Sequence, residues 1–149
     1  VFLIIGCVLG YFTALNQMNQ LSDPEYIALW TTRLEELKDF YITYFKGTGN
    51  EKYINPLKGF ESYLVSFDEE SALIEIMRKT DVTSPADNIP HIGLAHFSFS
   101  TGSKDAVLAL TERLRRDGFT VASEPRTTGD GFFESAILDP DGNLVEITV

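Results

Sequence analysis

Two stretches of this chain end in almost the same four residues, and this internal repeat constrains the fold more than any other feature. The segment LIEI at residues 73–76 is matched 71 positions later by LVEI at 144–147. Upstream, Tyr26 precedes His96 by 70 positions. A period of this length indicates two joined modules rather than a solenoid of many short repeats. Each module alone would leave one sheet face uncovered, so we expect the two sheets to enclose a space that is the candidate site.

Hydrophobic periodicity assigns the same order of elements to both halves. Apolar residues at spacings of three and four predict helices over 33–46 and 103–117, and Gly47 and Gly118 are placed to end them. Short apolar or alternating runs predict strands over 26–30, 60–67, 72–78, 93–100, 132–138 and 144–149. The predicted fold is α+β, with two tandem βαβββ modules forming a curved, cavity-enclosing mixed β-sheet and the helices outside.

The first 25 residues stand apart from this repeat. Residues 1–15 carry no charge, and residues 16–25 are polar like a linker. Fifteen helical residues reach only about 22 Å, which is short of a bilayer core of roughly 30 Å. The segment is therefore compatible with a cloning or gene-model extension, an apolar helix packed on the domain, or the end of a membrane anchor or export signal. We expect an extension over 1–25, a domain over 26–149 with modules at 26–78 and 91–149, and a cytoplasmic protein unless residues 1–15 are a truncated signal or anchor.

Composition excludes several classes of function. The net charge of −10 repels phosphate backbones, so nucleic acid is not an expected partner, and a membrane is expected only through residues 1–15. The single cysteine, Cys7, cannot form an intrachain disulfide or a CxxC metal site. A metal site built from nitrogen and oxygen ligands remains open.

Strand alternation predicts which polar side chains share a face. Residues two apart in a strand point to the same face, so Glu146 points away from the face that carries the aliphatic Val145 and Ile147. Glu75 points away from Ile74 and Ile76 in its own module in the same way. By the same rule His96 and Ser98 share a face. Two glutamates and a histidine on inward faces favour mutual pairing or a bound cation.

The final hairpin predicts two further residues of that cavity. Pairing Leu138 with Asn143 across the turn places Ser135 opposite Glu146 and Phe133 opposite Thr148. On this register, both Phe133 and Ser135 line the cavity.

These residues carry a resemblance to a known family. The segment EYIALWTTRLEELKDFYITYF at 25–45 is similar to the first strand and helix of the vicinal oxygen chelate superfamily, the glyoxalase/bleomycin-resistance/dioxygenase fold. The segment RTTGDGFFESAILDPDGNLVEITV at 126–149 resembles its closing hairpin, in which DPDGNxxE is the most specific part. The resemblance covers the chain from about Tyr26 to Val149.

The resemblance implies a metal site. Metal-dependent members bind one divalent ion through four inward positions, which fall here on Tyr26, Glu75, His96 and Glu146. Three of these match the family pattern, and Tyr26 departs from it, because a phenol is a poor ligand where the family has His or Gln. The implied cofactor is one divalent metal ion such as Zn, Ni, Mn, Co or Fe.

The implied activity is that of a glyoxalase-like, metal-dependent lyase or isomerase. It would act on a small oxygen-chelating carbonyl substrate through an enediolate-type intermediate, with Glu146 as base and Glu75 as the second candidate. Trp30, Ser98, Phe133 and Ser135 would line the substrate site of a homodimer. The alternative is a bleomycin-resistance-type protein that sequesters a small molecule without metal. A dioxygenase is less favoured, since its iron needs two histidines, and a membrane-tethered binding module is a third possibility.

Overall fold

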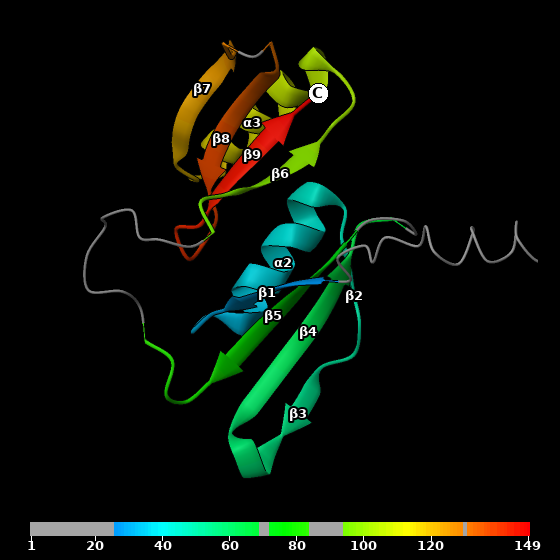
Figure 1. Cartoon of the computed structure of the whole chain (residues 1–149), viewed down its shortest axis with the longest axis vertical. Coiled ribbons are helices and arrows are strands. Elements are labelled where there is room, and N and C mark those ends of the chain that lie inside the picture. The colour runs from blue at the N-terminus through cyan, green and yellow to red at the C-terminus, as the bar shows by residue number, and fades with distance from the viewer. Residues whose placement is uncertain (1–25, 69–71, 84–93, 130) are drawn as a thin grey trace, which may run out of the picture.

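The computed structural model describes residues 26–68, 72–83, 94–129 and 131–149 (Figure 1). The first half contains β1 (Tyr26–Trp30), α2 (Leu34–Phe45), β2 (Thr48–Gly49), β3 (Tyr53–Asn55), η1 (Pro56–Lys58), β4 (Phe60–Ser66) and β5 (Leu73–Lys79). The second half contains β6 (Phe97–Ser100), α3 (Lys104–Arg116), β7 (Val121–Thr127), β8 (Phe133–Leu138) and β9 (Leu144–Thr148). The apolar segment 1–15 and the linker 16–25 lie outside the described residues.

The two halves repeat one topology, which confirms the α+β fold of two βαβββ modules. The first sheet has the order β1-β5-β4-β2 with β3 beside β4, and the second has the order β6-β9-β8-β7. In each sheet the first strand pairs in parallel with the last. Ala28 is opposite Glu75 in the first sheet and Ser98 is opposite Glu146 in the second. These registers preserve the sequence offsets of 70 and 71 residues.

Three short or irregular strands were not predicted. Strand β2 has two residues and β3 has three, too few to show a period of two. Strand β7 contains Pro125 and shifts its register between Val121 and Arg126. It lies at the edge of its sheet, where proline is tolerated. Strand β6 is shorter than predicted, and His96 lies directly before it.

Each helix covers one face of its own sheet. Leu37 and Tyr41 of α2 are fully buried in the same core as Ile76. In the second module Val107 and Leu114 of α3 are fully buried, as are Val145 and Ile147 of β9. The opposite face of each sheet has no helix over it among the described residues. We call these the open faces of the first and second sheets.

Helix α2 also joins the modules, and Figure 1 shows it between its own sheet and the second half. The ring of Phe45 lies 4.3 Å from that of Phe99, and the ring of Phe40 lies 4.9 Å from that of Phe119. The two sheets share no strand pairing in the described parts of the chain. A single chain therefore presents two separate open faces and does not close one sheet around a cavity.

No helix in the described ranges is long and apolar enough to cross a membrane.

Candidate functional site

The closing strand places Glu146 as its alternation predicts. Val145 and Ile147 are fully buried beneath α3, so the carboxylate of Glu146 points to the open face of the second sheet. Phe97 and Phe99 pack against the same core, which leaves Ser98 on the open face opposite Glu146. The sequence-based assignment of these faces is confirmed.

His96 and Glu146 lie together. The Nε2 atom of His96 is 3.4 Å from Oε2 of Glu146, and 44% of the His96 side chain and 20% of the Glu146 side chain remain accessible. An imidazole nitrogen and a carboxylate oxygen are the donors that borderline divalent ions accept. The pair fits two positions of such a site.

Glu75 and Tyr26 occupy the open face of the other sheet. In the parallel pairing of β1 with β5, Glu75 pairs with Ala28 and Tyr26 pairs with Leu73. By strand alternation, the side chains of Glu75 and Tyr26 therefore share the open face with Trp30. No hydrogen bond or ion pair joins the Glu75 carboxylate to another described residue. Within the described residues, no three His, Cys, Asp or Glu side chains are grouped to hold a metal. One chain therefore brings His96 and Glu146 together and leaves Glu75 apart from them.

The predicted register of the last hairpin is wrong by one residue. Leu138 pairs with Leu144, so Ala136 is opposite Glu146 and Ser135 is opposite Ile147. A shift of one residue moves every side chain to the other face. Ser135 is fully buried on the helix side, and its Oγ lies 2.6 Å from Thr111 Oγ1.

Phe133 has the same parity as Ser135 and packs toward the helix. The ammonium of Lys104 lies 5.0 Å from the centroid of the Phe133 ring. Neither Phe133 nor Ser135 shares a face with Glu146, so the expectation that they line the same cavity as this carboxylate is corrected.

A cavity of about 830 Å³ lies between the two modules on the helix side. Its walls come from β1, the start of β5, the end of α2, β6 and α3, and include Phe45, Phe99 and Leu110. Of the eight residues expected at the site, only Ser98 borders this cavity, although strand alternation turns its side chain to the open face. The positions at which a metal was expected lie elsewhere, on the open faces.

The DPDG turn contributes a buried carboxylate that the sequence indicated only as part of a turn. Oδ2 of Asp139 accepts a hydrogen bond of 2.7 Å from the Tyr41 hydroxyl, and both oxygens accept bonds from Asn143. Burial raises the pKa of Asp139 above its ordinary range, although these hydrogen bonds oppose the shift. Arg33 Nε holds the neighbouring Asp141 at 3.1 Å. These contacts tie the turn to α2, so its acidic residues have a structural role.

Solved structures share this arrangement at low sequence identity. A glyoxalase/bleomycin resistance protein/dioxygenase domain from Frankia superposes with a TM-score of 0.74 at 17% identity, over 87% of this chain and 98% of that one. The trypanothione-dependent glyoxalase I of Leishmania major gives 0.68 at 17% identity, over 85% of each chain. Glyoxalase I from Zea mays gives 0.68 at 19% identity, over 84% of this chain and 43% of that chain. A search of curated proteins finds no significant match.

The sequence model of the Glyoxalase/Bleomycin resistance protein/Dioxygenase superfamily matches residues 24–147. This range includes both modules, the paired His96 and Glu146, and the isolated Glu75. The chain belongs to the Glyoxalase/Bleomycin resistance protein/Dioxygenase superfamily.

Proposed function

We propose that this protein is a glyoxalase-like, divalent-metal-dependent lyase or isomerase that acts on a small oxygen-chelating carbonyl substrate. The observation that carries the proposal is the pairing of His96 with Glu146 at 3.4 Å on an accessible sheet face. A lone histidine is commonly a simple hydrogen-bond partner. A histidine beside a carboxylate, at two positions where the family resemblance expects ligands, favours a metal site over that simpler interpretation.

The proposed site is completed by a second copy of the chain. His96 and Glu146 lie on the open face of the second sheet, whereas Glu75 and Tyr26 lie on that of the first. A symmetric dimer can bring the first open face of one copy against the second open face of the other, and its symmetry then forms two such sites. We therefore propose a homodimer in which each ion has ligands from both chains.

The bound ion would supply Lewis-acid stabilisation of negative charge on a substrate oxygen. The chain's own contribution is the Glu146 carboxylate, which we propose as the general base. Glu146 takes the proton from the carbon next to the carbonyl and returns it to the neighbouring carbon, so the reaction is a net isomerisation. His96, which lies directly before β6, holds this carboxylate in place. Glu75 is the second candidate for the same proton transfer.

A small-molecule binder without turnover is the second candidate function. Tyr26 replaces a stronger nitrogen ligand, and its side chain is about half exposed. The first open face also presents Trp30, which is 48% exposed and offers a surface to an apolar ligand. These features favour sequestration if the protein proves to have no affinity for divalent ions.

Calorimetric titration of the chelator-stripped protein with Zn²⁺, Ni²⁺ and Co²⁺ separates the two functions. An enzyme of the proposed kind binds an ion tightly, and His96→Ala weakens the affinity by about 10- to 100-fold or more. His91→Ala is the matched control, because the chain's only other histidine matches no ligand position of the family. Turnover of hemithioacetals, vicinal diketones and catechols is then assayed with the ion present. Absence of ion binding and of turnover would favour the binder.

A further inference from the structure

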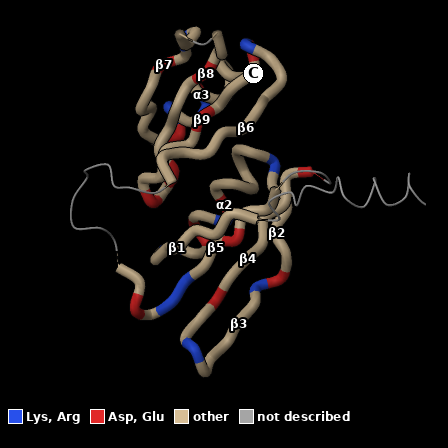
Figure 2. The backbone as a smooth tube through the Cα atoms, viewed as in Figure 1, with Lys and Arg blue, Asp and Glu red and all other residues tan. Residues whose placement is uncertain are grey.

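The cavity between the modules has mainly apolar walls. Phe45 of α2 and Phe99 of β6 pack against the core on one side and remain partly accessible on the other. Strands β1 and β6, which both border the cavity, carry no charged residue, as Figure 2 shows. A volume of about 830 Å³ lies within the range of about 300 to 1,000 Å³ that is typical of small-molecule sites.

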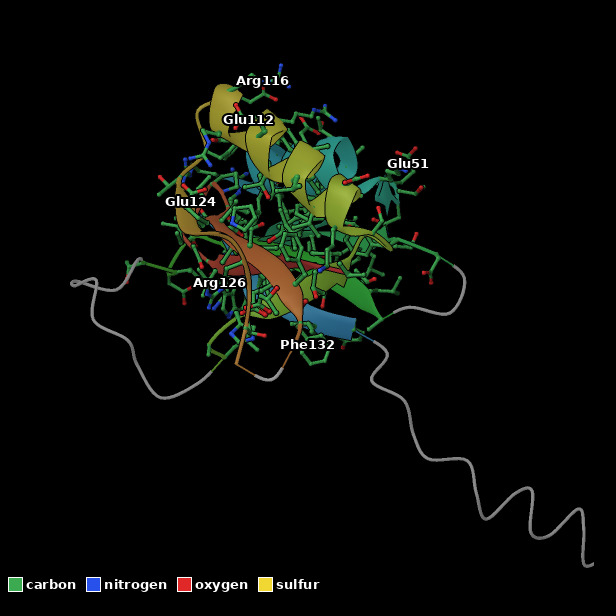
Figure 3. The ribbon with its side chains drawn as sticks, turned by 90° about the horizontal axis from the view of Figure 1, so that it is seen from above. Glu51, Glu112, Arg116, Glu124, Arg126 and Phe132 are labelled. Carbon is green, nitrogen blue, oxygen red and sulfur yellow. The ribbon has the colours of Figure 1, made fainter. Side chains whose placement is uncertain are left out.

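Helix α3 turns a second face to this cavity. One set of its residues is buried against its own sheet: Val107, Thr111 and Leu114. Another set, at spacings of three and four, borders the cavity: Ala106, Ala109, Leu110 and Arg113. Figure 3 shows Glu112 and Arg116 on the outer side of α3, away from the sheets. Arg113 is therefore the only charged residue that α3 contributes to the cavity wall.

Lys46 places a positive charge at the cavity where α2 ends. It has a left-handed backbone with φ of 59°, and its N–H donates to the Tyr41 carbonyl. Glycine is the residue that this conformation favours. The Lys46 side chain is exposed, and no hydrogen bond or ion pair joins its ammonium to another described residue. This ammonium is available to a ligand.

Arg113 places a second cation at the same end of the cavity. Its guanidinium carbon lies 4.9 Å from the centroid of the Tyr44 ring, and Tyr44 precedes Lys46 by two residues. Its Nε lies 3.9 Å from Asp117 Oδ2, beyond hydrogen-bonding distance, and the Tyr44 hydroxyl donates to that oxygen at 2.8 Å. The ring thus orients the guanidinium and leaves its N–H groups available to a ligand.

Positive charge exceeds negative charge among the described residues of the wall. Asp68 is the acidic residue there, against the two cations Lys46 and Arg113. The chain as a whole has a net charge of −10. A local excess of cations beside apolar walls is complementary to a ligand with an anionic head and an apolar body.

We infer that the cavity between the modules binds an amphipathic carboxylate. Its apolar chain lies between α3 and the rings of Phe45 and Phe99, and its carboxylate contacts Lys46 and Arg113. None of the four proposed metal ligands borders this cavity. The inference therefore adds a second binding site and does not depend on the proposed metal chemistry.

Three probes that share a decyl chain and differ in the charge of the head group test the inference. Decanoate, decanol and decyltrimethylammonium are each titrated calorimetrically into the full chain, below their micelle concentrations. Non-specific association with a chain of net charge −10 favours the cation. We expect decanoate to bind at least about tenfold more tightly than decyltrimethylammonium, with decanol between them. Octanoate, which is two methylenes shorter, should bind about tenfold more weakly than decanoate.

A charge variant tests the head-group contacts. Lys46→Gln combined with Arg113→Gln is expected to weaken decanoate binding about tenfold and to leave decanol binding unchanged. Lys58→Gln removes an exposed lysine of η1 that does not border the cavity, so it is the matched control and changes neither affinity.

A space-filling variant tests the position of the apolar chain. Ala109→Trp places a large ring in the cavity and should weaken decanoate binding about tenfold or more. Leu108→Trp is the matched control on the same helix, at a side chain that is 47% exposed and outside the cavity wall. Thermal unfolding checks that both variants fold. The head-group and chain-length preferences of the wild type test the inference even if Ala109→Trp does not fold.

Repeating the decanoate titration with a chelator separates this site from the proposed metal site. The affinity should stay unchanged, because the carboxylate contacts Lys46 and Arg113 rather than an ion. Loss of binding with the chelator would place the carboxylate on an ion and overturn the inference. Equal or tighter binding of decyltrimethylammonium, or unchanged decanoate affinity in the charge variant, also overturns it. So does the absence of decanoate binding by the full chain, which is the result expected if residues 1–15 or a second copy fill the cavity.

Discussion

Tyr41 and Asp139, 98 residues apart in the sequence, are joined by a buried hydrogen bond of 2.7 Å from the tyrosine hydroxyl to Oδ2 of the carboxylate. The tyrosine belongs to α2 of the first module, and the aspartate begins the turn between β8 and β9 of the second. The same tyrosine ring packs 6.0 Å from that of Phe97 at the edge of the second sheet. Together with the packing of Phe40 and Phe45 against the second module, this contact holds the two modules in their relative orientation.

Tyr41→Phe should destabilise the protein by about 1 to 2 kcal/mol, because it leaves a buried carboxylate oxygen with one donor fewer. Tyr44→Phe is the matched control on the same helix, where the hydroxyl bonds Asp117 at 2.8 Å in an exposed position. It should change the unfolding free energy by less than about 0.5 kcal/mol. Urea unfolding of both variants measures the difference, and equal losses would contradict the role assigned to Tyr41.

Asp139 should make stability fall as pH rises. Burial raises its pKa in the folded state above the ordinary 3.8, so the folded protein binds the proton more readily than the unfolded chain. The stability that Asp139 contributes is fully present below its ordinary pKa and is lost as the pH rises through its raised pKa in the folded state. The unfolding free energy of the wild type minus that of Asp139→Asn should therefore be smaller at about pH 7 than at about pH 4. A difference that grows with pH would mean that hydrogen bonding outweighs desolvation.

Ser135→Ala tests the register of the last hairpin. Thr111 donates its hydroxyl hydrogen to the Val107 carbonyl at 2.6 Å, so Ser135 is the donor to Thr111 Oγ1. Loss of this buried bond should cost about 1 to 2 kcal/mol of unfolding free energy. Ser98→Ala, on the open face, should cost less than about 0.5 kcal/mol. If Ser135→Ala lowers the unfolding free energy as little as Ser98→Ala does, Ser135 does not lie in the core.

The repeat made most of the fold predictable. Glu75 and Glu146 close two similar strands, and alternation around them correctly assigned Ile74, Ile76, Val145 and Ile147 to the core. Each end of helices α2 and α3 lies within one residue of the end predicted from their apolar spacing. Periodicity is informative here because one face of each element is buried and the other is not.

The remaining features depend on tertiary contacts. The predicted pairing of Leu138 with Asn143 was wrong, because the register that occurs lets Asp139 Oδ1 accept bonds from the amides of Asp141 and Asn143. Pairing within modules likewise cannot predict how the modules are oriented. The packing of Phe45 and Phe40 against the second module decides that orientation, and with it the separation of Glu75 from His96.

Glu146→Gln should remove most turnover while the fold stays, because an amide oxygen can still act as a ligand but cannot accept the proton. Thermal unfolding checks the fold, and kcat in the presence of the ion checks the chemistry. Unchanged kcat in Glu146→Gln would exclude Glu146 as the base.

Tyr26→His should increase metal affinity, since it supplies the nitrogen ligand that the family pattern expects.

Mixing two defective chains tests most directly whether each site is shared between copies. Glu75→Ala and His96→Ala should each bind ions weakly alone. In a mixed dimer, the intact Glu75 of one chain meets the intact His96 of the other at one site, while both defects fall together at the second. After unfolding and joint refolding of equal amounts, calorimetry should recover tight binding at about one quarter of the wild-type number of sites. No recovery in a verified mixed dimer would contradict the shared site.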